Sequence, residues 1–487
     1  MGSICGKANP TTIQPEEELP LTAASTAPEK SGWGRCRGPG ECCHGPDECC
    51  RAWCRCLVPT ICCIWVLLTV VGIVGGYSFV RVCSVPFTGI DIPLHAVGLV
   101  CKEGNIAVRL SDCSPGIFNC QFGMGKPFTP VNVSDSAMPG SLWTPECTGQ
   151  DLLDNQRELS SENPFELISF PSRKGEEGQP TINITAWWLP APGKDGKKAP
   201  RIVMSHGNNV NFNDNTVQLP AYMLRELGFS VLLPNLRDHG SSGNSTPHEI
   251  IWGYAYHLDL LGAWDYAVND PEGVLGGRMP DERVGIMGYS MGGFAAAIAF
   301  GVEPRVPAAW LDSAVFDLGE ELTFNLALIF GFLPPSVLSY MTAVSLWFGS
   351  YFAGANIELY QPASSLTSAA ALNVAKRRPV AVLQSTIDSY VGPEQSAEFA
   401  ALFGKHNASY DLSLTRRVKY SCGVKFPFTT HCQMHTWQAQ TYKDNLCEFW
   451  SRALGRDTDY CLHLPKVPPL GQSEEAYCPG PPAEVVT

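Results

Sequence analysis

The sequence from residue 161 to residue 455 predicts an α/β domain, in which a mostly parallel sheet is flanked by helices. Two observations lead to this prediction. After Pro164, short apolar runs alternate with stretches of helical periodicity, as they do in strand-helix-strand units. A Gly-x-Ser-x-Gly pentapeptide at residues 288–292 then stands between one apolar run and one helical pattern. The second observation also indicates where chemistry takes place.

The expected elements follow one another in a readable order. Two opening strands are FELISF and TINITAWWLP, and the later strands are RIVMSHG, FSVLLPNL, RVGIMGYS, VPAAWLDSA and PVAVLQSTID. Such near-continuous apolar runs are typical of strands that are buried on both faces of a parallel sheet. Helices are expected between them, at residues 218–227, 254–268, 291–301 and 437–454.

Composition limits the class of protein. The chain has 487 residues, of which 45% are hydrophobic, so it can bury one large core and carry appendages. Its formal net charge is -13, and no long basic run occurs. Nucleic-acid binding needs clustered Lys and Arg that neutralise phosphates, so nucleic-acid partners are not expected.

An uncharged stretch near the N-terminus predicts a transmembrane helix. No charged residue occurs between Arg55 and Arg81. At about 1.5 Å per helical residue, residues 57–80 are long enough for a hydrocarbon core of about 30 Å. The segment before them is too long for a cleaved signal peptide, and no small-residue cleavage site follows. A single retained span is therefore expected, which makes the bilayer a partner.

The flanking residues predict the orientation of this span. Four arginines precede it, against Arg81 and Lys102 after it, which favours a cytosolic N-terminus and a lumenal or extracellular main domain. Four Asn-x-Ser/Thr sequons agree with that side of the membrane, at Asn132, Asn183, Asn244 and Asn407. So does an even set of ten cysteines after the span, suited to an oxidising compartment: Cys83, Cys101, Cys113, Cys120, Cys147, Cys422, Cys432, Cys447, Cys461 and Cys478.

The character of the segments outside the α/β domain is predicted from their amino-acid composition. Residues 1–56 are rich in Pro, Gly, Ser, Glu and Cys without apolar periodicity, so they are expected to be disordered and cytosolic. Residues 81–160 form a Cys-containing juxtamembrane region, and residues 456–487 a Pro-rich C-terminal tail.

The N-terminal cysteines allow two interpretations. Cysteine pairs at 42/43, 49/50 and 62/63 lie close to the expected membrane face, where they are candidates for reversible S-acylation. A zinc site is the alternative, although the spacing fits no standard two-plus-two ligand pattern; its candidate ligands are Cys36, Cys42, His44, Cys49 and Cys54. Gly2 is available for myristoylation, but Gly6 stands where Ser or Thr is wanted.

The pentapeptide at residues 288–292 predicts the nucleophile. Its glycines permit the strained strand-to-helix turn that lifts a serine hydroxyl out of a sheet. Because a serine hydroxyl is a weak nucleophile without a base, a histidine and an acid must follow it in the chain. Ser290 is therefore the predicted nucleophile, and the alternative is an inert serine in a packing turn.

Candidates for the acid and the base follow Ser290 in the required order. Asp388 ends an expected strand, at the carboxyl edge of the sheet where loops assemble active sites. Asp312 ends the preceding strand and is the rival acid. For the base, His431 and His435 both lie between the last strand and the last helix. His431 is preferred, and geometry must decide between them.

The oxyanion hole should combine two backbone N–H groups. One belongs to Met291, just after the nucleophile, and the other to Asn208, in the loop after the strand that ends at Gly207. His206 precedes the elbow in a His-Gly turn and is expected to shape that loop.

From about residue 202 to residue 454, the chain resembles the α/β-hydrolase domain-containing membrane serine hydrolases and their bacterial relatives. The matching motifs are SHGNN, NLRDHGSSG, GYSMGG, IDSYVGP, FPFTTH and TWQAQTYKDNLCEF. The resemblance implies an α/β-hydrolase fold and favours His431, with two extra residues before the Thr-Trp-Gln that begins at Thr436. The family usually has Asp where Asn235 stands and Gly where Ser385 stands, and neither position belongs to the triad.

A second uncharged stretch, residues 322–357, interrupts the strand-helix alternation. It cannot be one membrane crossing, because Ser290 precedes it while Asp388 and His431 follow it. Pro334 and Pro335 also break any single helix there. An apolar helical lid over about residues 315–376 is expected, and ordinary core helices are the alternative.

These residues predict acyl transfer to water. Ser290 attacks an ester or thioester carbonyl, and the apolar lid favours a small-molecule lipid or acylated substrate. A serine peptidase of the same fold is the enzymatic alternative, and a catalytically inactive ectodomain that acts in binding is the non-enzymatic one. No cofactor and no metal are implied, and the sequence leaves the oligomeric state open.

Overall fold

The computed structural model describes thirteen stretches of the chain: residues 62–75, 99–102, 105–109, 166–175, 181–208, 212, 215–237, 239, 242–243, 255–420, 431–432, 434–463 and 484–486. The chain from Trp65 onward forms one compact unit. Residues 1–56, which are expected to be disordered, lie outside the described parts. So do most of residues 81–160, where cysteines suited to disulfides were noted. Within the second segment the structure describes one antiparallel pair, β1 (Leu99–Lys102) and β2 (Asn105–Arg109).

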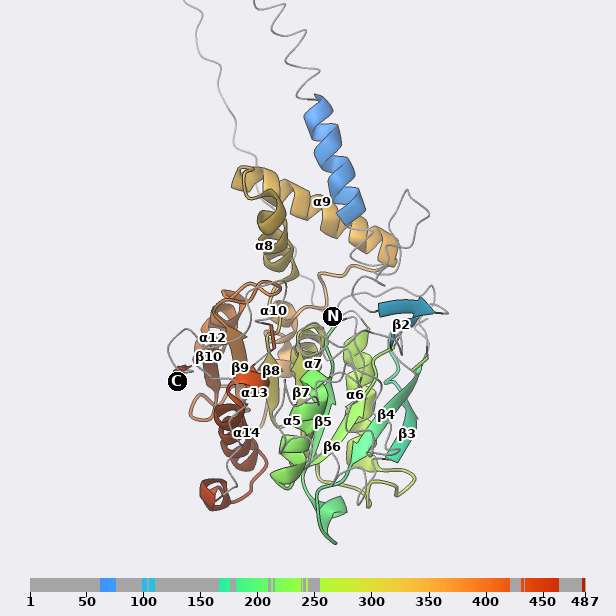
Figure 1. The fold of residues 1–487 in the computed structure, drawn as a ribbon, viewed down its shortest axis with the longest axis vertical. Coiled ribbons are helices and arrows are strands. Elements are labelled where there is room, and N and C mark those ends of the chain that lie inside the picture. Colours follow the sequence, from blue (N-terminus) through green and yellow to red (C-terminus); the bar gives the residue numbers. More distant parts are fainter. Residues whose placement is uncertain are drawn as a thin grey trace, which may run out of the picture. The chain divides into compact units, whose positions relative to one another are not determined.

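The core of the unit is a nine-stranded sheet in the order β11-β10-β9-β8-β7-β5-β6-β4-β3 (Figure 1). Its central strands, from β6 to β10, run parallel, whereas β3, β4 and β11 are antiparallel to their neighbours. The strands are β3 (Glu166–Pro171), β4 (Asn183–Leu189), β5 (Arg201–Ser205), β6 (Ser230–Pro234), β7 (Val284–Tyr289), β8 (Ala309–Asp312), β9 (Val380–Ser385), β10 (Arg416–Tyr420) and β11 (Glu484–Val486).

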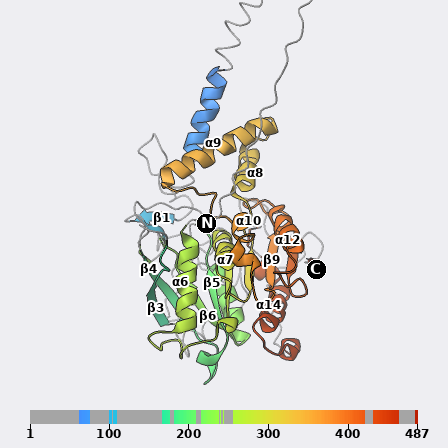
Figure 2. The same cartoon turned by 180° about the vertical axis from the view of Figure 1, so that it is seen from behind.

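Apolar side chains of the strands alternate between two buried layers. Trp310 belongs to the layer shared with α5 (Asn215–Glu226) and α14 (Ala439–Ala453). The next residue, Leu311, belongs to the opposite layer with α6 (Tyr256–Asn269), α7 (Met291–Val302) and α12 (Gln395–Lys405). Successive strand residues point to opposite faces, so helices cover both faces of the sheet, as the two opposite views show (Figures 1 and 2).

The interruption between β8 and β9 is a helical insertion, residues 315–376. It contains α8 (Leu318–Phe330), α9 (Pro335–Ala353), α10 (Pro362–Ser365) and α11 (Ala369–Leu372). The Asp317 side chain caps α8 by accepting the Glu320 N–H at 3.0 Å. Pro335 occupies the first turn of α9, where its missing N–H costs nothing. The two prolines therefore separate two helices, as the sequence predicts.

The expected transmembrane segment appears as a helix over residues 62–75, and the remainder of residues 57–80 lies outside the described parts. Among the described residues, no helix combines the length and the apolar character that a bilayer crossing needs. From Trp65 onward this helix contacts α9: the Trp65 and Tyr340 rings lie 4.6 Å apart edge to face, and Ser345 donates to the Gly72 carbonyl at 3.0 Å.

Several details near the C-terminus differ from the expectation. The last helix is divided at Gln438 into α13 (Met434–Trp437) and α14, and β10, β11 and α12 were not predicted. In the tail, η4 (Asp459–His463) is tied to α14 by a disulfide between Cys447 and Cys461. Two further 3-10 helices are η2 (Gly196–Lys198) and η3 (Asp281–Arg283).

One cysteine corrects the expectation of an even disulfide set. Cys432 is a free, buried thiol. Its Sγ donates to the Asp312 carbonyl oxygen at 3.8 Å, and the side chain belongs to the buried cluster that contains Trp310. Cys62 and Cys63 are free and exposed, and their acylation remains a prediction.

Candidate active site

Ser290 stands on a sharp turn between β7 and α7. Its backbone has φ 52° and ψ -120°, a combination that a residue with a side chain rarely adopts. The neighbouring glycines make this turn possible. A Cβ on Gly288 would lie 2.1 Å from the Gly292 carbonyl oxygen, and one on Gly292 would lie 2.3 Å from the His206 carbonyl oxygen. This strained strand-to-helix turn, called the elbow below, is the local geometry that the pentapeptide predicts.

The elbow places Ser290 beside the loop that follows β5. A Cβ on Gly207 would approach the Ser290 Cβ to 3.3 Å, so the two backbones meet across the site. Asn208, the next residue, is half-buried. Met291 is the first residue of α7, and the first N–H groups of a helix have no intrahelical acceptor. The two predicted oxyanion donors therefore belong to backbone segments that flank Ser290.

Asp388 and His431 are in direct contact. The His431 Nδ1 donates to the Asp388 Oδ2 at 2.7 Å. The other carboxylate oxygen, Oδ1, accepts the N–H groups of Tyr390 at 2.8 Å and Val391 at 3.1 Å. Gln384 also donates to Oδ2, at 3.1 Å. A carboxylate with this many fixed donors holds one orientation, so the histidine ring that it binds is oriented as well.

Hydrogen bonds to the last residue of β8 connect Ser290 with the residue that follows His431. The Ser290 N–H donates to the Asp312 carbonyl oxygen at 2.8 Å, and the Cys432 thiol donates to the same oxygen. Because Cys432 follows His431 directly, the loop of the histidine and the elbow meet at one carbonyl group. No hydrogen bond joins Ser290 to His431 in the described part of the chain. Catalytic hydrogen bonds often tighten only when substrate binds.

The rival acid, Asp312, is differently placed. Its carboxyl group is fully buried and is bonded to the Ser313 hydroxyl at 3.1 Å and the Tyr442 hydroxyl at 3.3 Å. Burial raises the pKa of Asp312 to about 7, against the lowering effect of Ser313. His431 thus pairs with Asp388, and Asp312 supports the elbow through its backbone.

The rival base, His435, lies in the core. It is inside α13, fully buried against the rings of Tyr289 and Tyr442. Neither of its ring nitrogens has a hydrogen-bond partner within the described residues. Burial lowers the pKa of His435 to about 3. A buried histidine that contacts the elbow only through the Tyr289 ring, and that no acid orients, does not fit a general base.

His206 has the structural role that the sequence predicts. Its Nδ1 donates to the Gly207 carbonyl at 2.8 Å, and its Nε2 accepts the Leu236 N–H at 3.0 Å. This bonding requires the neutral ring, and burial lowers the pKa of His206 to about 3. The histidine therefore fixes the loop that contains Asn208.

Sequence reasoning missed two polar side chains that bond to Asp388 or to the loop after it. Gln384, inside β9, faces Asp388 four residues later, and Glu321, on α8, accepts the Gly392 N–H at 3.0 Å. The Gln384 contact had a sequence signal, because a polar residue interrupts the apolar run VAVLQS. Glu321 had none, because its partner lies 71 residues away.

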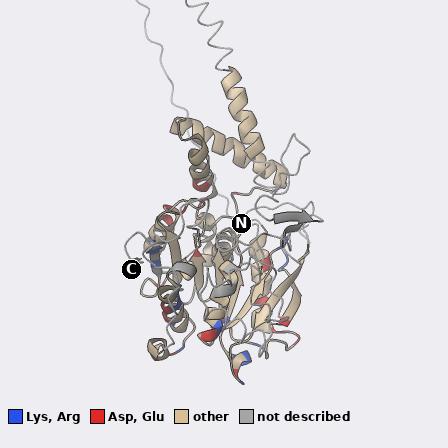
Figure 3. Ribbon diagram, in the orientation of Figure 1, with Lys and Arg blue, Asp and Glu red and all other residues tan. Residues whose placement is uncertain are grey.

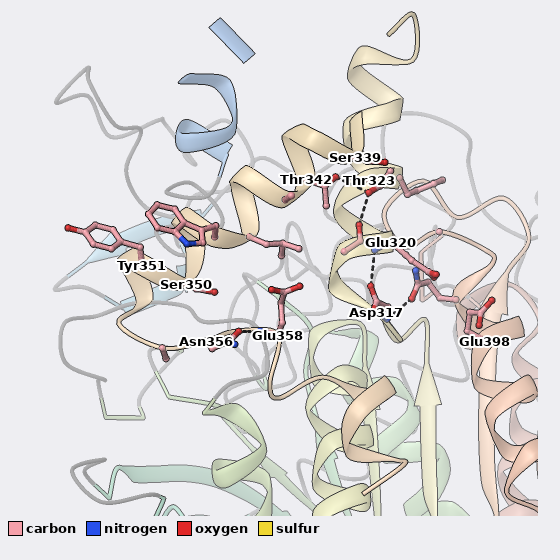
Figure 4. Close-up of a pocket in the computed structure, with 18 of the residues that line it drawn as sticks. Asp317, Glu320, Thr323, Ser339, Thr342, Ser350, Tyr351, Asn356, Glu358 and Glu398 are labelled. Atoms are coloured by element: carbon pink, nitrogen blue, oxygen red, sulfur yellow. Dashed lines mark hydrogen bonds between the residues drawn. The ribbon is translucent and has the colours of Figure 1, made fainter. Parts of the chain in front are cut away.

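A cavity of about 1250 Å³ lies between the helical insertion and the loop after β9 (Figure 4). Phe324, Leu346, Trp347 and Tyr351 give it an apolar wall. Carboxylates also line it: Asp317, Glu320, Glu358, Glu394 and Glu398. Ser290, Asp388 and His431 do not line the cavity. Gly392, in the loop that contains Asp388, is part of its wall.

Among the described residues, no group of three or more His, Cys, Asp or Glu side chains is arranged to hold a metal ion. The candidate zinc ligands of residues 36–54 lie outside the described parts.

No family model and no curated protein matches the chain. Similar solved structures include an esterase of Pyrococcus furiosus, 18% identical with a TM-score of 0.40 over 59% of this chain and 91% of that one. An acylaminoacyl peptidase of Pyrococcus horikoshii is 18% identical with a TM-score of 0.42, over 63% and 45%. A puromycin-hydrolyzing peptidase of Mycobacterium tuberculosis is 18% identical with a TM-score of 0.41, over 60% and 40%. At these values the similarity carries no argument about the site, which rests on its own geometry.

Proposed function

We propose that this protein is a membrane-anchored serine hydrolase that cleaves ester or thioester bonds of lipid or acylated substrates. In this proposal Ser290 is the nucleophile, His431 the general base and Asp388 its orienting acid. The observation that carries it is the 2.7 Å contact between Asp388 and His431, in a loop that meets the strained elbow at the Asp312 carbonyl.

The proposed reaction proceeds through an acyl-enzyme. The Ser290 Oγ attacks the carbonyl carbon while its proton passes to the His431 Nε2, and Nδ1–H stays bonded to Asp388. The N–H groups of Met291 and Asn208 stabilise the oxyanion. The leaving alcohol or thiol takes the proton from Nε2 as its bond to carbon breaks. Water then gives a proton to the same nitrogen as it attacks the acyl-enzyme, and Nε2 returns that proton to the Ser290 Oγ as the bond between Oγ and the acyl carbon breaks and the acid leaves.

The apolar part of the cavity wall supports an acyl substrate. We assign the helical insertion as a lid, and the cavity beneath it as the acyl pocket, because Phe324, Leu346 and Trp347 form its wall. The wall of this pocket includes Gly392, four residues after Asp388, and none of the three proposed triad residues.

This assignment predicts a chain-length preference. Each buried methylene contributes about 0.8 kcal/mol, so kcat/KM for p-nitrophenyl esters should rise roughly 3- to 4-fold per methylene until the pocket is full. Changing Trp347 and Tyr351 to Ser should flatten this rise. Leu359→Ser, an exposed apolar residue of the insertion outside the cavity wall, should leave it intact. A wild-type preference for acetyl that the wall variant shares contradicts the lid and favours a small-ester hydrolase or a peptidase.

The proposed membrane anchoring rests on an apolar surface. Trp65, Val66 and Leu67 are exposed on the helix of residues 62–75, and this helix packs on α9. The insertion adds exposed Ile329 and Phe332, and few charged residues interrupt this part of the ribbon (Figure 3). Large apolar side chains exposed in numbers are unusual unless a partner covers them, and the proposed partner is the bilayer.

The proposed topology places the α/β domain in the lumen or outside the cell. Two of the sequons can be located, and the Asn183 and Asn407 side chains are exposed. Both should therefore be glycosylated when the chain is made in a eukaryotic secretory pathway. Endoglycosidase should increase the gel mobility of the wild type and not that of a variant in which all four sequon asparagines are changed to Gln. Mobility that is unchanged in both means that the domain faces the cytosol.

A further inference from the structure

One acidic side chain of the insertion reaches the loop of the catalytic acid. Glu321 lies on α8 and is 7% exposed. Its Oε2 accepts the Gly392 N–H at 3.0 Å, and its Oε1 accepts the Asn325 side-chain amide at 2.7 Å. Asn325 also donates to the Tyr390 carbonyl at 3.3 Å. Two residues one helical turn apart therefore hold the backbone of residues 390–392.

The same three residues form the turn that fixes Asp388. Tyr390 and Val391 donate their N–H groups to the Asp388 Oδ1, and the Tyr390 ring lies 5.4 Å from the His431 ring. Gly392 follows directly. A movement of Gly392 would therefore alter the donors of Asp388, and with them the orientation of the imidazole.

We propose that Glu321 is a positioning residue, which fixes the Asp388 turn from the lid and so makes the alignment of Asp388 with His431 depend on the seating of α8. This inference rests on the proposed function. It deepens that function, because it assigns the lid a role in the chemical step besides substrate binding.

The contacts of α8 suit this role. A Cβ on Gly392 would lie 3.3 Å from the Phe324 ring, so the helix and the turn are in close contact. On its other side, α8 is joined to α9 by a hydrogen bond of 2.8 Å between Thr323 and Thr342. A displacement of the lid helices would therefore act on the Asp388 turn through the Glu321–Gly392 contact.

The charge of Glu321 gives a second line of support. Burial raises the pKa of Glu321 to about 7, against the lowering effect of the Gly392 N–H and the Asn325 amide. The charged groups that face it are Asp388, which raises this pKa, and His431, which lowers it. When ionised, Glu321 favours the imidazolium form of His431, which the reaction generates.

The test compares Glu321→Ala, Glu321→Gln and the wild type on p-nitrophenyl acetate, which is too small to need the acyl pocket. The alanine variant should lose roughly 10- to 100-fold in kcat with little change in KM, because the turn loses its acceptor. Glutamine can still accept the Gly392 N–H, so it should restore most of kcat. It should also shift the acid limb of the kcat/KM profile down by roughly 0.5 pH unit, because the charge that favours imidazolium is gone.

The control is Glu282→Gln, which removes an exposed carboxylate in η3 and should change neither quantity. Wild-type kcat in the alanine variant overturns the proposal. So does an equal loss in both Glu321 variants with no shift of the pH profile, which indicates a merely structural role. Failure of the proposed function is separable, because the wild type would then lack fluorophosphonate labelling that depends on Ser290.

Discussion

Replacing Ser290 by alanine is expected to abolish ester hydrolysis, with a loss in kcat on the order of 10⁶-fold. No other residue can form the acyl-enzyme in the proposed mechanism, and the small activity that remains would come from the oxyanion donors and from binding. The fold should survive, because the Ser290 side chain is only half-buried at the surface of the elbow and is not part of the apolar core. Thermal unfolding and circular dichroism check that point.

A matched serine variant serves as the control. Ser364→Ala changes an exposed serine of the helical insertion and should retain wild-type hydrolysis. Substantial hydrolysis in well-folded Ser290→Ala means that the elbow is not the nucleophile.

The second large effect separates the two candidate histidines. His431→Ala should lose on the order of 10⁴-fold in kcat, because no group then takes the proton of Ser290. His435→Phe should retain hydrolysis, because His435 packs between aromatic rings and contacts no residue of the proposed triad. Asp388→Asn should lose about as much as His431→Ala. If the losses belong to His435 and Asp312 instead, the base and the acid are wrongly assigned.

The pH dependence follows from the same pair. Burial by itself lowers the pKa of His431, but the Asp388 carboxylate outweighs it and raises that pKa above its ordinary value of 6.5. The base must be neutral, so kcat/KM should fall as the pH drops through the raised pKa. The attraction between Asp388 and protonated His431 also stabilises the folded protein. This contribution is fully present at pH values below the pKa that His431 has in the unfolded chain, and it is lost as the pH rises through the higher pKa of the folded protein.

Most of the parallel sheet could be predicted from sequence, because most of its strands are short runs of mainly apolar residues. The runs at residues 284–289 and 380–385 are buried at every position, so an apolar run was enough to locate them. β10 was missed because its sequence, RRVKY, lacks that pattern. It joins the sheet by pairing with β9, which is a tertiary contact.

The candidate site was predictable to the extent that it is local. The elbow can be predicted from its glycines. His431 and His435 are only four residues apart, so local sequence does not separate them, and the choice depends on the contact of His431 with Asp388, 43 residues away. The contact between Glu321 and Gly392 joins residues 71 apart and has no local pattern. The transmembrane prediction rests on apolar composition alone. A helix that packs on α9, as residues 65–75 do, needs an apolar composition too.

The central claim is that the Ser290 Oγ forms a covalent bond with the substrate's acyl carbon, and a fluorophosphonate reports that chemistry directly. The full chain would be labelled, digested and analysed by tandem mass spectrometry. We expect one adduct, on Ser290, and slower labelling when a competing long-chain ester is present. An adduct on a different serine, or no adduct on a folded protein that hydrolyses esters, would contradict the claim.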